Sequence, residues 1–173
     1  MNRAVVRNGY PHPPQDETEV KLDSDAEASL DRLKKYFSLM FVVSNQPDVA
    51  RGLQKKSTVK RINGVIGSRL PITDFFVCYH DDDDGCDCRK PLPGLILRAA
   101  AHYDVDLQGS YLIGDRWRDI EAGVSAGCTT IWINRHYAER APSVPASASV
   151  ESLRQAVDEI ISLEAGRLAS TCQ

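Results

Sequence analysis

Apolar and polar positions along the chain follow two periods that alternate from the first quarter of the sequence to its end. Amphipathic stretches, with apolar residues three or four positions apart, predict helices, and short apolar runs between them predict buried strands. Expected helices begin near Ser24 and Gly94, span Val59 to Leu70, contain Ile120, Ala122 and Val124, and cover about 150–165. Expected strands are Phe37–Val43, Thr73–Tyr79, Tyr111–Ile113 and Thr129–Ile133.

The ends of these elements carry local signals. Ser24 and Glu27 have the spacing of a capping box at the start of the first helix. Gly127 is a plausible stop for the fourth helix. Residues 1–22 and 138–149 lack periodicity and are expected to be irregular, and the tail after Gly166 is expected to fray.

Strands that alternate with helices predict an α/β fold with a doubly wound, mostly parallel sheet. We expect one domain over residues 1–173, because this length gives one core and is short for two. Ligands bind at the carboxyl ends of strands in such sheets. The polar pairs Ser44-Asn45, Arg89-Lys90 and Asp115-Arg116 each follow a predicted strand, so they should converge on one rim.

Composition narrows the class of protein. Apolar residues make up 42% and charged residues 26% of the chain, and the formal net charge is -3. Nucleic-acid binding calls for a basic face, which this charge does not suggest. No apolar run approaches the ~18 residues of a membrane span, and the N-terminus lacks the apolar block of a secretory signal. We therefore expect no nucleic-acid or membrane partner. The five cysteines are a poor disulfide framework and suit a reducing compartment, so we expect a cytoplasmic protein, and we also expect a monomer.

A polar loop at about 78–93 holds three of the five cysteines. Cys78, His80, Cys86 and Cys88 form two close pairs and match the Cys₃His set of closed structural zinc sites. Calcium is a poor alternative to zinc despite the run of aspartates, because it takes six to eight oxygen ligands. A loop of reduced cysteines without metal is the other alternative.

Three polar clusters suit a phosphate site. Ser44 and Asn45 stand at a strand end, Lys90 supplies a positive charge, and Asp115 and Asp119 offer carboxylates for Mg²⁺. Each cluster alone has an ordinary explanation: a turn, a solvated lysine, or a helix cap. Their order on successive strands favours the joint interpretation.

These motifs, read in order, resemble the haloacid dehalogenase superfamily. The order is Ser44-Asn45-Gln46, Cys78-x-His80, Cys86-Asp87-Cys88-Arg89-Lys90-Pro91 and Gly114-Asp115-x-x-x-Asp119. The string is most similar to the branch that contains heptose bisphosphate phosphatases and the histidinol-phosphate phosphatase domain. The resemblance covers about residues 9–135.

The resemblance implies a Mg²⁺-dependent phosphomonoesterase that forms an aspartyl-phosphate. It implies that Ser44 binds the transferring phosphoryl group with help from Asn45, and that Lys90 neutralises its charge. It assigns Mg²⁺ to Asp115, with Asp119 in support, and substrate contacts to Arg89 and Arg116. Arg51 also matches a family position but receives no role.

The chain departs from the family at its start. The family's first strand is central in the sheet and ends in Asp-x-Asp-Gly, which carries the nucleophile and the acid/base. No Asp-x-Asp follows an apolar strand here: Asp23 and Asp25 stand at a helix start, and Asp81 to Asp84 lie in the cysteine loop. We expect the first strand to be missing and the natural protein to begin upstream; a degenerate, non-catalytic relative is the alternative.

The expected substrate is a small phosphorylated metabolite, D-glycero-D-manno-heptose 1,7-bisphosphate in the first place. Histidinol phosphate is the alternative substrate. A zinc-bearing module that binds phosphorylated ligands without turnover is a further alternative. Because the nucleophile segment is missing, we expect the chain as given to be inactive.

Overall fold

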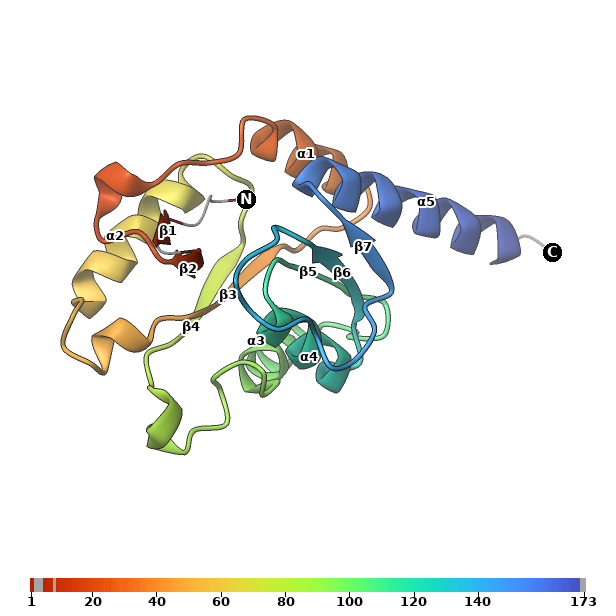
Figure 1. Cartoon of the computed structure of the whole chain (residues 1–173). Coiled ribbons are helices and arrows are strands. Elements are labelled where there is room, and N and C mark those ends of the chain that lie inside the picture. The colour runs from red at the N-terminus through yellow and green to blue at the C-terminus, as the bar shows by residue number, and fades with distance from the viewer. Residues whose placement is uncertain (2–4, 8, 172–173) are drawn as a thin grey trace.

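The computed structural model describes residues 1, 5–7 and 9–171 (Figure 1). The regular elements, in chain order, are β1 (Val5–Arg7), β2 (Tyr10–His12), the 3₁₀ turn η1 (Glu17–Glu19), α1 (Ala26–Leu33), β3 (Phe41–Asn45), η2 (Pro47–Val49), α2 (Lys56–Gly67), β4 (Asp74–Cys78), η3 (Asp82–Asp84), α3 (Gly94–Tyr103), β5 (Tyr111–Gly114), α4 (Trp117–Ala126), β6 (Thr129–Ile133), β7 (Ala148–Val150) and α5 (Leu153–Thr171).

The larger strands form parallel sheets, as the alternation of strands and helices predicts. β3 pairs with β4 in parallel, from Phe41 opposite Asp74 to Asn45 opposite Cys78. β5, β6 and β7 form a second parallel sheet in that order. In the described residues no strand pairing joins the two sheets. β1 and β2 form a separate antiparallel hairpin.

Side chains from both sheets share the main hydrophobic core, so the core holds the two sheets in one molecule. α1 and α5 pack together over it (Figure 1). Its buried members come from α1, α2, β6 and α5 and include Leu30, Ile62, Ile131, Val157 and Ile160. Burying one such side chain contributes roughly 1.5–3 kcal/mol.

Several predicted boundaries were wrong at the first helix and the first strand. The helix begins after Asp25, which forms no side-chain cap bond, so Ser24 is not the cap. The strand predicted from Phe37 begins only at Phe41, because Phe37 packs sideways against the ring of Tyr111 and the main core. Residues 1–22, predicted to be irregular, contain β1, β2 and η1.

The last quarter of the chain differs more from the prediction. The segment predicted as a surface connection ends in β7, which includes Val150, so α5 begins at Leu153 and not at 150. The tail expected to fray after Gly166 continues as helix to Thr171, and this end of α5 projects from the body of the molecule (Figure 1). Val124, one of the apolar residues of the predicted fourth helix, is exposed on α4.

Other boundaries are as predicted. Gly94 opens α3, β6 spans Thr129 to Ile133, and Gly127 ends α4 in the left-handed conformation. No helix in the described part of the chain combines the length and apolar character needed to cross a bilayer.

Candidate functional site

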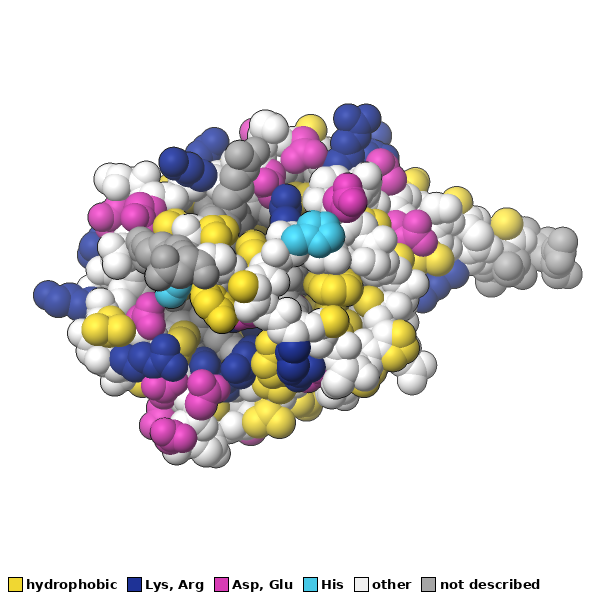
Figure 2. Space-filling view, viewed as in Figure 1, with side chains coloured by type: hydrophobic (Ala, Val, Ile, Leu, Met, Phe, Trp, Pro, Cys, Tyr) yellow, Lys and Arg dark blue, Asp and Glu magenta, His cyan; other side chains and the backbone are white. Residues whose placement is uncertain are grey.

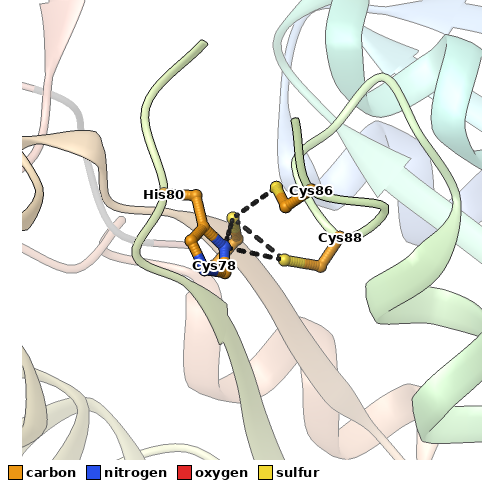
Figure 3. Close-up of side chains that lie close together, drawn as sticks. All are labelled: Cys78, His80, Cys86 and Cys88. Atoms are coloured by element: carbon orange, nitrogen blue, oxygen red, sulfur yellow. Dashed lines mark hydrogen bonds between the residues drawn. The ribbon is translucent and has the colours of Figure 1, made fainter. Parts of the chain in front are cut away.

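The four predicted metal ligands lie together after β4. Cys78 is the last residue of β4, and Cys86 and Cys88 approach it from the far side of the η3 turn (Figure 3). All four ligand atoms lie within 4.8 Å of one another. His80 presents Nδ1, which the sequence did not specify, at 3.5 Å from Cys78 Sγ and 3.3 Å from Cys88 Sγ.

These separations suit a tetrahedral ion. Zn–S bonds of about 2.3 Å place two sulfur ligands roughly 3.7 Å apart. Cys78 Sγ lies 3.8 Å from Cys86 Sγ and 3.2 Å from Cys88 Sγ. Burial raises the pKa of the Cys78 thiol to about 12, so a metal entering the site must displace its proton.

Ion pairs surround the metal loop, which is the cysteine-rich segment at about 78–93 that carries the four predicted ligands. Arg51 makes two bonds of 2.6 Å to the Asp81 carboxylate, and Arg89 makes bonds of 2.7 and 3.1 Å to Asp82. Arg118 also reaches Asp82, at 3.4 Å. Figure 2 shows Lys and Arg side chains gathered beside this acidic turn. The arginines nearest the loop are therefore already paired with its own aspartates.

The loop leads directly to Lys90, which is 8% exposed. Its ammonium lies 2.6 Å from Asp119 and donates to the Val43 carbonyl at 2.6 Å. The Asn45 amide bonds to both backbone groups of Lys90, at 2.9 and 3.0 Å. Asn45 thus fixes the Lys90 backbone, a role that the sequence did not indicate.

A cavity of about 730 Å³ opens between β3 and β5, and the predicted polar residues gather at one end of it. Ser44, Lys90, Asp115 and Asp119 all line it, so the structure brings these four predicted residues together. Gln46 donates to the Ser44 hydroxyl at 3.0 Å. Gly114 is required here, because a Cβ at this position would collide with the Asp119 side chain.

Asp115 follows β5 and is held by a residue that the sequence analysis missed. The Tyr137 hydroxyl donates to Asp115 Oδ2 at 2.9 Å. Burial, and then the nearby Asp119 carboxylate, raise the pKa of Asp115. Two carboxylates this close oppose each other's ionisation, and a bound divalent cation would relieve that repulsion. The donor set therefore fits Mg²⁺.

The remaining predicted substrate residues point elsewhere. Arg89 is turned to the metal loop, and the Arg116 guanidinium forms a bidentate pair with Glu139. The Arg116 backbone N–H donates to Asp119 Oδ2 at 3.1 Å, which caps the start of α4. Neither arginine lines the cavity.

Comparisons with known proteins agree with this geometry. A family model described as HAD-hydrolase-like matches residues 87–156. The D-glycero-beta-D-manno-heptose-1,7-bisphosphate 7-phosphatase of Bordetella bronchiseptica is 41% identical over 92 residues, which cover 50% of this chain and 51% of that protein. The enzyme of the same name from Pseudomonas aeruginosa is 32% identical over 119 residues, 66% of each chain.

A solved structure extends the likeness over nearly the whole chain. The crystal structure of the D,D-heptose 1.7-bisphosphate phosphatase from B. bronchiseptica, complexed with magnesium and phosphate, superposes with a TM-score of 0.76 at 27% identity and covers 92% of both chains. In the sequence alignments the chain spans between about half and two thirds of the curated relatives' length. With its parallel α/β fold and converging motifs, the chain belongs to the HAD-like hydrolase family.

Proposed function

We propose that this chain provides the phosphate- and magnesium-binding machinery of a HAD-type phosphomonoesterase, with D-glycero-D-manno-heptose 1,7-bisphosphate as substrate. The observation that carries the proposal is the convergence of Lys90, Asp115 and Asp119 at one end of the cavity. The names of the relatives support the choice of substrate.

Each residue has a distinct proposed role. Lys90 neutralises charge on the phosphoryl group, because electrostatics and positioning dominate phosphoryl transfer. Ser44 donates its hydroxyl to a phosphoryl oxygen. Asp119 holds the Lys90 ammonium in place, and Asp115 coordinates Mg²⁺. When bound, Mg²⁺ supplies charge stabilisation to the phosphate oxygens.

Asn45 and Arg89 also make contacts that the resemblance does not assign. Asn45 positions Lys90 through its backbone, and Arg89 secures the metal loop by its pair with Asp82. Arg116 braces Glu139, which lies two residues after Tyr137. All three therefore shape the site from behind the cavity wall.

The resemblance implies a nucleophilic carboxylate in addition to Asp115 and Asp119. The carboxylates that line the cavity, within the described residues, are Asp115 and Asp119, and both have other roles. This observation favours a second function for the chain as given: it binds the phosphorylated substrate without turning it over.

We further propose that the cysteine loop holds one structural zinc ion. The Cys₃His donor set is typical of closed zinc sites, and its atoms are already gathered. Metal analysis of the purified chain should find one zinc per chain. Cys78→Ser should lose it, whereas Cys128→Ser, which changes a thiol outside the cluster, should keep it.

Calorimetric titration with the heptose bisphosphate, with and without Mg²⁺, tests the binding function. We expect Mg²⁺-dependent binding that Asp115→Asn abolishes and that Asp104→Asn, the same change at the exposed end of α3, leaves intact. Phosphate release should be absent. Preference for histidinol phosphate would change the substrate, and binding indifferent to Mg²⁺ would overturn the proposal.

A further inference from the structure

A groove of about 520 Å³ lies between α2 and β4. One wall is a flank of α2, and in Figure 1 this helix lies on the side of β4 that is away from β3. The other wall comes from β4 and the residue after it, and consists of Phe75, Val77 and Tyr79. No residue that lines this groove also lines the cavity of the candidate site. We call it the α2–β4 groove.

The groove adjoins a strand edge that has no partner strand in the described part of the chain. The Gln46 N–H donates to the Cys78 carbonyl at 2.7 Å, so Cys78 directs its backbone groups toward β3. Successive residues of a strand direct these groups to opposite edges, so Val77 and Tyr79 present theirs on the other edge. No hydrogen bond to either backbone on that edge occurs among the described residues. A further strand can therefore pair there.

Two glycines on α2 leave the groove open. A Cβ at Gly67 would lie 3.2 Å from the Phe75 ring, whereas a Cβ at Gly64 would meet nothing within 4 Å. Glycine inside a helix is less favourable than alanine, and close packing does not require it at Gly64. The space beside Gly64 is therefore available to the side chains of an occupant.

The rim of the groove carries unbalanced positive charge. The Lys56 ammonium lies over the Tyr79 ring, 5.1 Å from its centroid, and Lys60 lines the groove. Neither lysine has an ion-pair partner among the described residues, and α2 contains no acidic residue. A second copy of β4 would bring two more lysines to the same edge, and like charges oppose such pairing. The charge therefore favours an acidic partner over a second copy.

We propose that the α2–β4 groove binds an extended acidic segment of a partner protein, which adds to β4 as a further strand. The backbone of that segment pairs with Val77 and Tyr79. Its apolar side chains cover Phe75, and its carboxylates meet Lys56 and Lys60. A small anion would meet the lysines but leave the strand edge unpaired. The inference goes beyond the proposed phosphatase function and does not depend on it.

A synthetic peptide, titrated into the full chain and followed by amide NMR, tests the proposal. The probe is slightly longer than the five residues of β4. Valines and then glutamates occupy its alternate positions, with threonines between them, and it is made in both sequence directions because a strand edge accepts either. We expect saturable shifts at Val77 and Tyr79 with one direction. The same peptide with glutamines for glutamates should bind about fivefold more weakly at low salt, because the ion pairs are lost.

Gly64→Leu fills the groove and separates binding from folding. Its melting temperature should not fall, because leucine favours a helix more than glycine does, yet probe binding should weaken about tenfold or more. Gly166→Leu, the same change at a glycine of α5 whose Cβ would also meet nothing within 4 Å, should keep full binding.

Four results would overturn the proposal. They are equal binding of the glutamine peptide, undiminished binding by Gly64→Leu, shifts confined to other elements, and no binding of the probe in either direction. Self-association of the chain through β4, detected as protection of Val77 and Tyr79 without peptide, would assign the edge to a second copy and also overturn it.

Discussion

Lys90 owes its position to three separate parts of the chain. The end of β3 supplies the Val43 carbonyl and the Asn45 amide, α4 supplies Asp119, and the metal loop delivers the residue itself. The sequence predicted that Lys90 and Asp119 belong to one phosphate site. It did not predict the role of Asn45, because that bond depends on how a strand end meets a loop 45 residues away.

Lys90→Met should destabilise the protein, because it leaves the Asp119 carboxylate largely buried without its partner. Removing one member of a buried pair costs about 3–5 kcal/mol. The double variant Lys90→Met/Asp119→Asn should recover part of that loss, since no uncompensated charge remains. Urea unfolding of the three proteins measures the difference. Equal stability of the single and double variants would contradict the expectation.

Tyr137→Phe should weaken divalent cation binding about tenfold, because the hydroxyl no longer orients the Asp115 carboxylate. Mn²⁺ binding followed by electron paramagnetic resonance gives the affinity without relying on turnover. Tyr36→Phe, at an exposed position, is the matched control. Unchanged Mn²⁺ affinity would show that the Tyr137 hydroxyl has no positioning role.

Elements differ in how well the sequence predicts them. β6 has the predicted bounds, because Thr129 to Ile133 is an unbroken run of β-favouring residues. β7 was missed, since Ala148 and Ser149 have no strand propensity and pair only because β6 offers an edge. Tyr137 was missed for a related reason: the connection between β6 and β7 has no period that predicts where a side chain points.

The metal loop is the element that most directly shapes the site. Cys86→Ser should lower zinc content and also weaken phosphate-ligand binding, because Cys88 immediately precedes Arg89 and Lys90. Zinc analysis and titration calorimetry on one preparation test both effects. Cys128→Ser is the matched control. Normal ligand affinity in a zinc-free protein would separate the loop from the site.

Glu121 of α4 forms an ion pair and hydrogen bonds with the connection between β6 and β7. Its bonds with Arg140, and then with Ser143, lower the pKa of Glu121 to about 2. A carboxylate with a depressed pKa stabilises the fold above its unfolded pKa of about 4.5, and the contribution is lost as the pH falls toward 2.

Glu121→Gln should therefore lower stability at pH 7, by about 1 kcal/mol because Arg140 is half exposed and screened by solvent. The difference in stability between the variant and the parent chain should shrink as the pH falls from 4.5 to 2. Thermal unfolding across this range measures it. Glu27→Gln, on the exposed side of α1, should show no such gap. A gap that stays constant with pH would contradict the assignment.

At the scale of the whole molecule, the two sheets are joined by a core and not by strand pairing. The fold class and the convergence of the polar motifs followed from the alternation of elements, because parallel strands bring their carboxyl ends to one rim. Within the described residues β3 and β5 belong to different sheets. The size of the cavity and the direction of each arginine depend on packing between distant segments, which no local pattern encodes.

The ion pairs around the metal loop have a consequence for how fast a ligand arrives. Three carboxylates, Asp48, Asp81 and Asp82, already balance the charges of Arg51, Arg89 and Arg118. Little positive potential therefore extends into solvent to steer a dianion toward the cavity. Association should then be slow for a charged pair and nearly insensitive to ionic strength, unlike steered encounters, which slow steeply as salt is added.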